Sequence, residues 1–289
     1  MWFDAHTVTL DALQAACIAL PAAGLPWWLE RFRGRSWALV PPLSIAVVVG
    51  VIAAVPVSAD IFTWTALLLV PIGCALGLGW AMHGARPWLA ILAVPLLVLA
   101  WTSQTEAAGQ LAGTLLIVGS VVALGRLLAG ASALPLIKVG VVAMASIDAY
   151  LVFSNQLQAS NAVLIAAKPG PGLPQLQSAT FGHSDLGYGD FFAAAVVGAV
   201  LAAEGVPQLR AAVAMFAVTL CWDQLFAFYD VLPATVPPAL VLIGSELLRR
   251  RARREDDAGP RFDPAHVDPR GSPHRPAGVG SPRPATRPQ

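Results

Sequence analysis

Two stretches decide the fold of this chain: KVGVVAMASIDAYLVF at residues 138–153 and HSDLGYGDFFAAAVVGAVLAA at residues 183–203. Each is a long apolar run that carries an aspartate, Asp148 in the first and Asp190 in the second. A helix that crosses a bilayer needs about 20 mostly apolar residues, and an ionisable group inside it costs about 2.5–3.5 kcal/mol on insertion scales. The two stretches therefore predict membrane-spanning helices in which both acids need a functional reason.

The composition of the whole chain also predicts a membrane protein. Of its 289 residues, 56% are hydrophobic and 12% are charged, with a mean hydropathy of +0.66. Soluble domains carry about 25% charged residues, so this chain has too few polar groups to cover a water-exposed surface. The composition excludes a soluble globular protein, a nucleic-acid binder driven by overall charge and a fully disordered chain. It predicts an all-α polytopic membrane protein whose surroundings are the lipid bilayer.

Nine segments approach the length and apolarity of a spanning helix. They are residues 8–28, 37–57, 61–82, 86–103, 107–130, 134–157, 181–204, 209–229 and 232–248. The predicted organisation is a nine-helix membrane domain over residues 1–248 and a tail over residues 249–289. The tail holds ten of the 16 arginines and eight prolines, cannot bury a core, and is predicted to be disordered.

The basic residues predict the orientation, because loops rich in Lys and Arg are retained in the cytoplasm. With the N-terminus outside, the arginines at 31–35 and 249–254 fall in the cytoplasm, and among the loops between helices only Lys168 falls outside. The loop 158–180 is then extracytoplasmic and the C-terminus cytoplasmic. Arginine far outnumbers lysine, and Ala, Pro and Gly are abundant, which indicates a GC-rich bacterial genome and hence a bacterial plasma membrane.

The two aspartates fall at one predicted depth. Asp148 lies about ten residues before the outer end of the predicted helix 134–157, and Asp190 about ten residues into the predicted helix 181–204. At 1.5 Å per residue both are about 15 Å below the outer boundary. Two carboxyls that close share a proton, so one can act as a general base on water while the other donates to a carbonyl. A proton or cation relay in a transporter uses intramembrane acids equally well.

Irregular backbone is predicted beside both acids. Gly187 and Gly189 stand just before Asp190, and glycine allows a backbone to leave helical geometry. Pro237 and Pro238 remove two amide donors near the start of the last predicted span, so the chain before them is not expected to be fully helical. Irregular backbone at membrane depth is tolerated where it lines a cavity or is buried in protein.

These elements together resemble the presenilin and signal peptide peptidase family of intramembrane aspartyl proteases. The family has an Asp in helix 6, GxGD in helix 7 and PAL in helix 9 of nine. Here the matching residues are Asp148, Gly187-Tyr188-Gly189-Asp190 and Pro238-Ala239-Leu240. The motifs cover residues 134–248, and the earlier helices match by number alone. The family usually has Tyr-Asp in helix 6, whereas Ile147 precedes Asp148 here and the nearest tyrosine is Tyr150.

The resemblance implies an intramembrane aspartyl endopeptidase with Asp148 and Asp190 as its catalytic pair. Gly187, Tyr188 and Gly189 would shape the backbone beside the acid, and Pro238, Ala239 and Leu240 would hold an unwound transmembrane substrate as an added strand. Signal peptide peptidases share the predicted orientation, which favours single spans with a cytoplasmic N-terminus, such as leftover signal peptides. No metal or other cofactor is implied.

Two alternative functions, and the role of one further acid, remain open at this point. Prepilin-type peptidases also contain GxGD but cut at the cytoplasmic face and lack a late PAL element. A transporter, or an inactive homologue that binds membrane helices, would keep the acids without hydrolysis. Asp223 lies inside the predicted helix 209–229, where we expect a structural hydrogen bond or a place near the pair. The oligomeric state and the natural substrate do not follow from the sequence.

Overall fold

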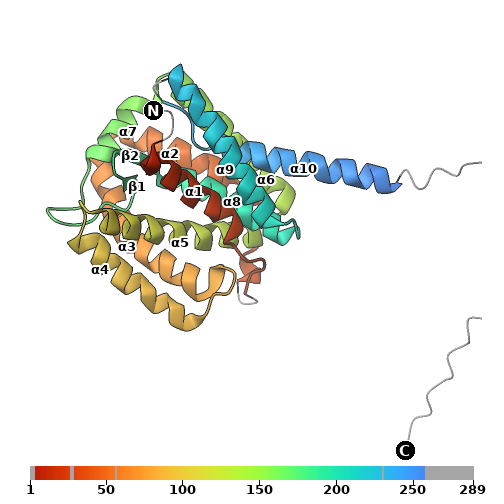
Figure 1. Cartoon of the computed structure of the whole chain (residues 1–289), viewed down its shortest axis with the longest axis horizontal. Helices are drawn as coiled ribbons and strands as arrows, with labels where there is room; N and C mark the ends of the chain where they lie inside the picture. The colour runs from red at the N-terminus through yellow and green to blue at the C-terminus, as the bar shows by residue number, and fades with distance from the viewer. Residues whose placement is uncertain (1–3, 27–28, 56, 230, 258–289) are drawn as a thin grey trace, which may run out of the picture. The chain divides into compact units, whose positions relative to one another are not determined.

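The computed structural model of the chain describes residues 4–26, 29–55, 57–229 and 231–257, which are mostly helical (Figure 1). The α-helices are α1 (Ala5–Ala19), α2 (Val40–Ala54), α3 (Ser58–Leu76), α4 (Ala93–Thr102), α5 (Ala107–Ala131), α6 (Leu134–Phe153), α7 (Leu157–Ala166), α8 (Tyr188–Ala203), α9 (Gln208–Asp223) and α10 (Val236–Asp257). Tighter 3-10 turns cover Glu30–Phe32, Arg35–Leu39, Pro87–Leu92 and Gln224–Ala227, and a π turn covers Gly77–Ala81. Strands β1 (Ser178–Phe181) and β2 (Ser184–Gly187) pair antiparallel, Ser178 opposite Gly187.

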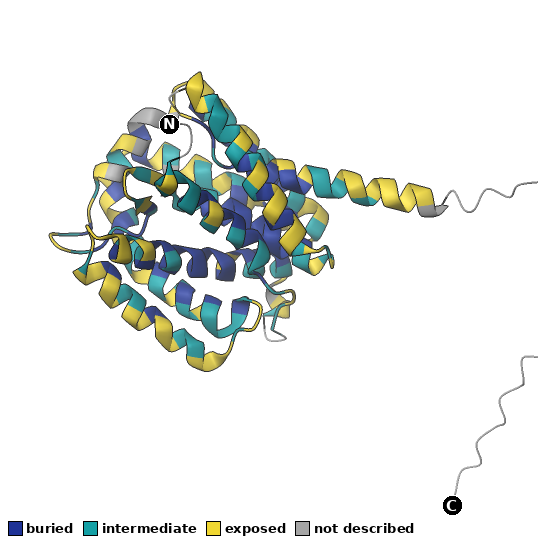
Figure 2. Ribbon diagram, in the orientation of Figure 1, coloured by how far each residue is buried: buried dark blue, intermediate teal, exposed yellow. Residues whose placement is uncertain are grey.

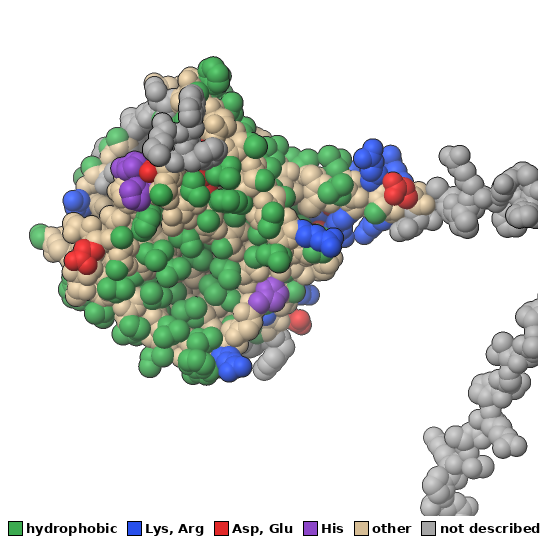
Figure 3. All heavy atoms as spheres, in the orientation of Figure 1, with side chains coloured by type: hydrophobic (Ala, Val, Ile, Leu, Met, Phe, Trp, Pro, Cys, Tyr) green, Lys and Arg blue, Asp and Glu red, His purple; other side chains and the backbone are tan. Residues whose placement is uncertain are grey.

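Five helical segments are long and apolar enough to cross a membrane. They are Arg35–Ile52, Ser58–Ala81, Ala107–Ala131, Leu134–Phe153 and Gln208–Ala227, and shorter apolar helices cover Pro87–Thr102 and Tyr188–Ala203. Apolar side chains cover much of the surface in Figure 3; Ile61 and Leu68 of α3, for example, are each 65% exposed. An apolar surface of this extent is typical of a lipid-facing protein. By length and composition, the chain is therefore a helical membrane protein.

Helix α8, which carries Asp190, lies at the centre of the packing. It contacts α5 and α1, and its residues 191–201 are all buried (Figure 2). A Cβ atom added at Gly125 of α5 would lie 2.7 Å from the Ala195 carbonyl, and one at Gly198 would lie 2.5 Å from the Ile18 carbonyl oxygen. Small residues let helix backbones approach this closely in membrane proteins. Helix α8 is thus packed tightly between α5 and α1 around Ala195 and Gly198.

Several predicted boundaries are wrong in informative ways. The predicted helix 181–204 begins only at Tyr188, because Gly182 turns the chain with a φ of +63° and residues 178–187 pair as strands. The predicted loop 158–180 contains most of α7. The first predicted span, 8–28, ends as a helix at Ala19, and Pro21 instead forms a backbone bridge with Met82. Hydropathy averaged over a window merges such short elements with their apolar neighbours.

The predicted division of the chain after residue 248 is found in the structure, but the start of the predicted tail is helical. The chain divides into two units, Met1–Leu248 and Arg249–Gln289. Residues 249–257 continue as helix, so the predicted disorder of the tail is wrong for this part; its arginines, alanine and glutamate are good helix formers. The remainder of the predicted tail, residues 258–289, lies outside the described residues.

Candidate active site

Asp148 lies near the C-terminal end of α6 and is 7% exposed. Its Oδ2 accepts a 2.6 Å hydrogen bond from the hydroxyl of Thr235, which is 2% exposed. Thr235 belongs to the non-helical stretch 231–235 just before α10, where the prolines predict irregular backbone. A hydrogen bond to a carboxylate is stronger than one between neutral groups. The side chain of Asp148 is therefore held by the segment that precedes α10.

Asp190 is the third residue of α8, immediately after the hairpin. Its Oδ2 accepts a 3.0 Å hydrogen bond from the N–H of Gly187, the residue that caps the helix. A carboxylate at this position satisfies an otherwise unpaired amide and interacts favourably with the positive end of the helix dipole. Asp148 and Asp190 also line the same two cavities. The structure thus brings the two predicted acids together, each held by a different backbone segment.

Gln14 of α1 joins the segments that hold the two acids. Its Nε2 donates one hydrogen bond to the carbonyl oxygen of Asp190 and one to that of Ala234, both at 3.1 Å, and the residue is 1% exposed. Ala234 is the neighbour of Thr235, the donor to Asp148. A single buried amide therefore ties the first turn of α8 to the stretch before α10. In the sequence, Gln14 stands out only as a glutamine within an apolar segment. The sequence does not identify its partners, because they lie 176 and 220 residues away.

Asp148 and Asp190 lie where two cavities meet. One cavity, of about 650 Å³, is rich in carboxylates and is lined from α1, α6, α8, α9, β2 and the stretch before α10. The other, of about 800 Å³, is mostly apolar and is lined from α2, α3, α5, α6, α7 and α8. The residues common to both are Asp148, Leu164, Gln177, Gly187 and Asp190. The acids therefore face a polar space and an apolar space at once.

The polar cavity holds a second carboxyl pair. The side chains of Asp11 on α1 and Asp223 on α9 both line this cavity and interact with each other. Asp11 is 4% exposed, and its Oδ2 has no partner among the described residues. Asp223 thus lies beside another acid and lines the same cavity as Asp148 and Asp190. The sequence places Asp11 near a helix end and gives no sign that these two acids meet.

The glycine motif before α8 lines the same space. Gly187 lines both cavities, and Tyr188 and Gly189 line the apolar one. A Cβ atom at Gly187 would lie 3.1 Å from the Oδ2 of Asp190, closer than most such contacts, so the glycine leaves room for the carboxylate. The Tyr188 hydroxyl is 2.9 Å from the Oγ of Ser120 on α5, which anchors this turn to the core.

The proline motif lies beside the cavities. Pro238, Ala239 and Leu240 lie near the start of α10 and line neither cavity; Ala239 is buried and Leu240 is 45% exposed. The neighbouring residues that line a cavity are Thr235 and Pro237. Tyr150, the tyrosine nearest to Asp148, is 64% exposed. The acid site is therefore built from the residues immediately before Pro238-Ala239-Leu240.

Strand β2 forms one wall of the polar cavity. All four of its residues, from Ser184 to Gly187, line this space, and the chain passes directly from Gly187 into α8. Of the described residues, Asp4, His6 and His183 bring potential metal-ligand atoms together, at the rim beside this strand.

Searches of protein-family models, of characterised proteins and of solved structures find no match to this chain.

Proposed function

We propose that this chain is an intramembrane aspartyl endopeptidase, similar to presenilin and signal peptide peptidase, with Asp148 and Asp190 as its catalytic pair. The observation that carries the proposal is the position of both carboxyls at the junction of an apolar cavity and a polar one. Peptide hydrolysis inside a membrane needs an apolar place for the substrate helix and a separate supply of water. Asp148 and Asp190 line both the apolar cavity and the polar cavity, which could supply the substrate helix and the water.

The chemistry follows from two carboxyls that share one proton. The ionised carboxyl removes a proton from water, whose oxygen attacks the carbonyl carbon of the peptide bond. The protonated carboxyl donates to the carbonyl oxygen, which yields a tetrahedral diol. Collapse of the diol breaks the C–N bond, and the leaving amine takes a proton from the pair. Thr235 and Gly187 keep one oxygen of each acid in place, so the pair needs no rearrangement during the reaction.

The substrate enters this site through the apolar cavity. Its walls come from α2, α5, α6 and α8, and side chains such as Ile45, Leu128 and Phe192 suit a lipid-soluble helix. Near the acids the substrate must unwind, because a helical peptide bond is shielded by its own side chains and hydrogen bonds. Strand β2 and the stretch before α10 then offer backbone partners to an extended segment.

The proposal includes nine spans, with the N-terminus outside and the C-terminus in the cytoplasm. Helices occur within all nine predicted segments, and the basic clusters alternate with them in the required way. This orientation favours substrates whose N-terminus is cytoplasmic, such as signal peptide remnants. A reporter fused after residue 289 should be active only in the cytoplasm; an extracytoplasmic signal would reverse the orientation and the substrate class.

The experiment that tests the activity uses the full chain, purified in detergent and returned to liposomes. A synthetic single-span signal peptide is incubated with it, and products are identified by mass spectrometry. The wild type should cut within the apolar segment, and Asp148→Asn and Asp190→Asn should not. Asp60→Asn is the matched control, because Asp60 is exposed at the start of α3. Full activity in either variant of the pair would refute the assignment, and binding without cleavage by the wild type would favour an inactive helix-binding homologue.

A further inference from the structure

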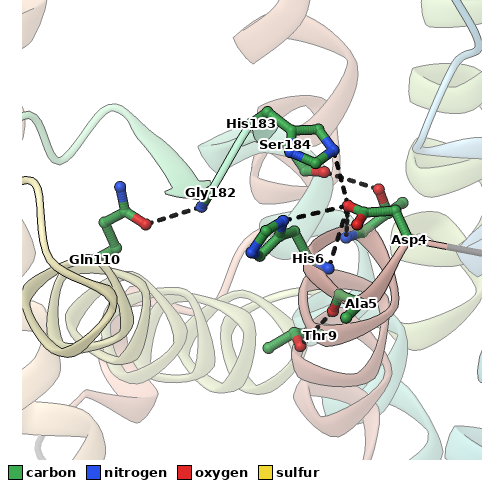
Figure 4. A network of polar contacts seen from close by, with 9 residues as sticks. Asp4, Ala5, His6, Thr9, Gln110, Gly182, His183 and Ser184 are labelled. Carbon is green, nitrogen blue, oxygen red and sulfur yellow. Dashed lines mark hydrogen bonds and ion pairs between the residues drawn. The ribbon is translucent and has the colours of Figure 1, made fainter.

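Three potential metal ligands meet at the rim of the polar cavity. Asp4 caps the N-terminus of α1, His6 lies in its first turn, and His183 lies in the turn between β1 and β2 (Figure 4). One ligand atom from each side chain lies within 4.8 Å of the other two. They come from segments more than 170 residues apart, so the cluster is a product of the fold.

The spacing within the cluster suits a tetrahedral metal ion. The Oδ2 of Asp4 lies 3.4 Å from the Nδ1 of His6 and 2.9 Å from the Nε2 of His183. Zinc binds imidazole and carboxylate at about 2.0–2.2 Å, which separates neighbouring tetrahedral ligands by about 3.4 Å. Two imidazoles and one carboxylate are typical zinc ligands, and three protein ligands leave one position for water.

The Nδ1 of His6 provides a second, independent observation. This atom is shielded from solvent although the His6 side chain as a whole is 42% exposed, and within the described part of the chain it has no hydrogen-bond partner, although the carboxylate of Asp4 lies beside it. A buried polar nitrogen without a partner is costly unless something unseen satisfies it. A metal ion between Asp4, His6 and His183 would satisfy this nitrogen.

The surroundings hold the cluster in place. A Cβ atom at Gly182 would lie 2.5 Å from the His6 ring, so only glycine at this turn allows the ring its position. The N–H of Gly182 donates a 2.8 Å hydrogen bond to the Oε1 of Gln110 on α5, and the hydroxyls of Thr7 and Ser184 are 2.7 Å apart. The hairpin turn and the start of α1 are thus joined before any metal binds.

We propose that Asp4, His6 and His183 form a binding site for a divalent transition-metal ion of the zinc class. Bound metal ties the start of α1 to the turn of the hairpin. Strand β2 runs from that turn to Gly187 and Asp190, so the ion would restrain the segment that leads into the candidate active site. Binding itself does not depend on protease activity, and the test below measures binding alone.

The test uses the full chain, purified with a histidine-free tag and stripped with a chelator. Zinc is titrated in competition with a chromophoric chelator, and cobalt is added separately as a spectroscopic probe. The wild type should bind one zinc ion more than His183→Ala, or hold it at least about tenfold more tightly, since even outer-shell partners contribute that much. Cobalt should give the visible bands of a tetrahedral site in the wild type and not in His183→Ala.

The matched control is His83→Ala, because His83 lies in a turn outside the cluster with its Nδ1 beside the carbonyl of Leu20. It should bind zinc as the wild type does. Asp4→Asn adds a variant that keeps the helix cap, since asparagine caps as well as aspartate, yet it removes a charged ligand and should weaken binding. Equal zinc affinity and stoichiometry in wild type and His183→Ala would overturn the proposal, as would a wild type that binds no zinc at micromolar concentration.

Discussion

The polar cavity contains two pairs of carboxyl groups that differ in how they are held. Asp11 and Asp223 interact with each other, whereas Asp148 and Asp190 each accept a hydrogen bond from a separate donor. Only the second pair also lines the apolar cavity. Because both pairs consist of neighbouring carboxyls, a shared proton does not by itself distinguish a catalytic pair. Asp148 and Asp190 are distinguished by their access to the apolar cavity, the space proposed for the substrate helix.

The two pairs also differ in whether an asparagine could take over the role of an aspartate. A hydrogen bond between two carboxyls needs one of them protonated, and an asparagine amide can donate in its place. A catalytic pair needs one acid to take a proton and the other to give one, which no amide can do. Asparagine substitutions at the four positions therefore separate the two pairs.

The largest effect is expected for Asp148→Asn or Asp190→Asn. Either change removes a proton acceptor or donor from the reaction, and kcat should fall at least about 10³-fold. Initial rates on a single-span peptide in liposomes measure this, and circular dichroism checks that the variants remain folded. Combining the two changes should lower kcat no further, because the acids act as one unit; an additive loss would show that they act separately.

The next effect concerns the donor to Asp148. Thr235→Val keeps the shape of the side chain but removes its 2.6 Å hydrogen bond. Hydrogen bonds to charged groups contribute about 1.5–3 kcal/mol, so kcat/KM should fall about 10- to 100-fold. Thr235→Ser keeps the hydroxyl and should retain most of the activity. Equal losses in the two variants would show that packing at this position matters and the hydrogen bond does not.

The sequence predicts the parts of this site that depend on local pattern. The apolar runs predict helices around both acids, and the prolines predict the non-helical residues 231–235, which the structure confirms. The hairpin before α8 is not predicted, because its four-residue strands are short and hydropathy merges them with the strongly apolar helix that follows. Glycine at 182 and 187 is its one visible signal.

The remaining parts of the site come from contacts between distant segments. Gln14 reaches partners on α8 and before α10, and Asp11 meets Asp223 from the other end of the chain. Periodicity and hydropathy describe neighbours along one helix and carry no information on which helices pack together. A buried amide or acid in an apolar run therefore predicts that a partner exists, but the fold alone identifies it.

A comparison of Gln14 with Gln208 separates an effect on stability from an effect on activity. Gln14→Met leaves the carbonyls of Asp190 and Ala234 without this donor, which costs about 1–3 kcal/mol per buried group. Since α8 and the stretch before α10 would lose their connection, kcat should also fall about tenfold. Thermal unfolding and initial rates are measured on the same samples.

The control for this change is Gln208→Met. The Nε2 of Gln208 lies within hydrogen-bond distance of three backbone carbonyls, those of Ile18, Pro21 and Gly198, toward the opposite end of α8 from Asp190. This variant should lose as much thermal stability while its kcat stays within about twofold of the wild type. A tenfold loss of kcat in both variants would mean that α8 responds as a whole, and that Gln14 has no special link to the acids.

The smallest effect is expected at the second carboxyl pair. Asp11→Asn keeps the size of the side chain and donates from its amide to Asp223, so kcat and thermal stability should both stay close to wild type, within about twofold for kcat. Asp11→Leu instead leaves the half-buried Asp223 without its partner and should cost about 1–3 kcal/mol of stability. If Asp11→Asn lowered kcat as far as Asp148→Asn, all four carboxyls would belong to one proton-transfer system. The distinction between the pairs would then fail, and access to the apolar cavity would no longer identify the catalytic acids.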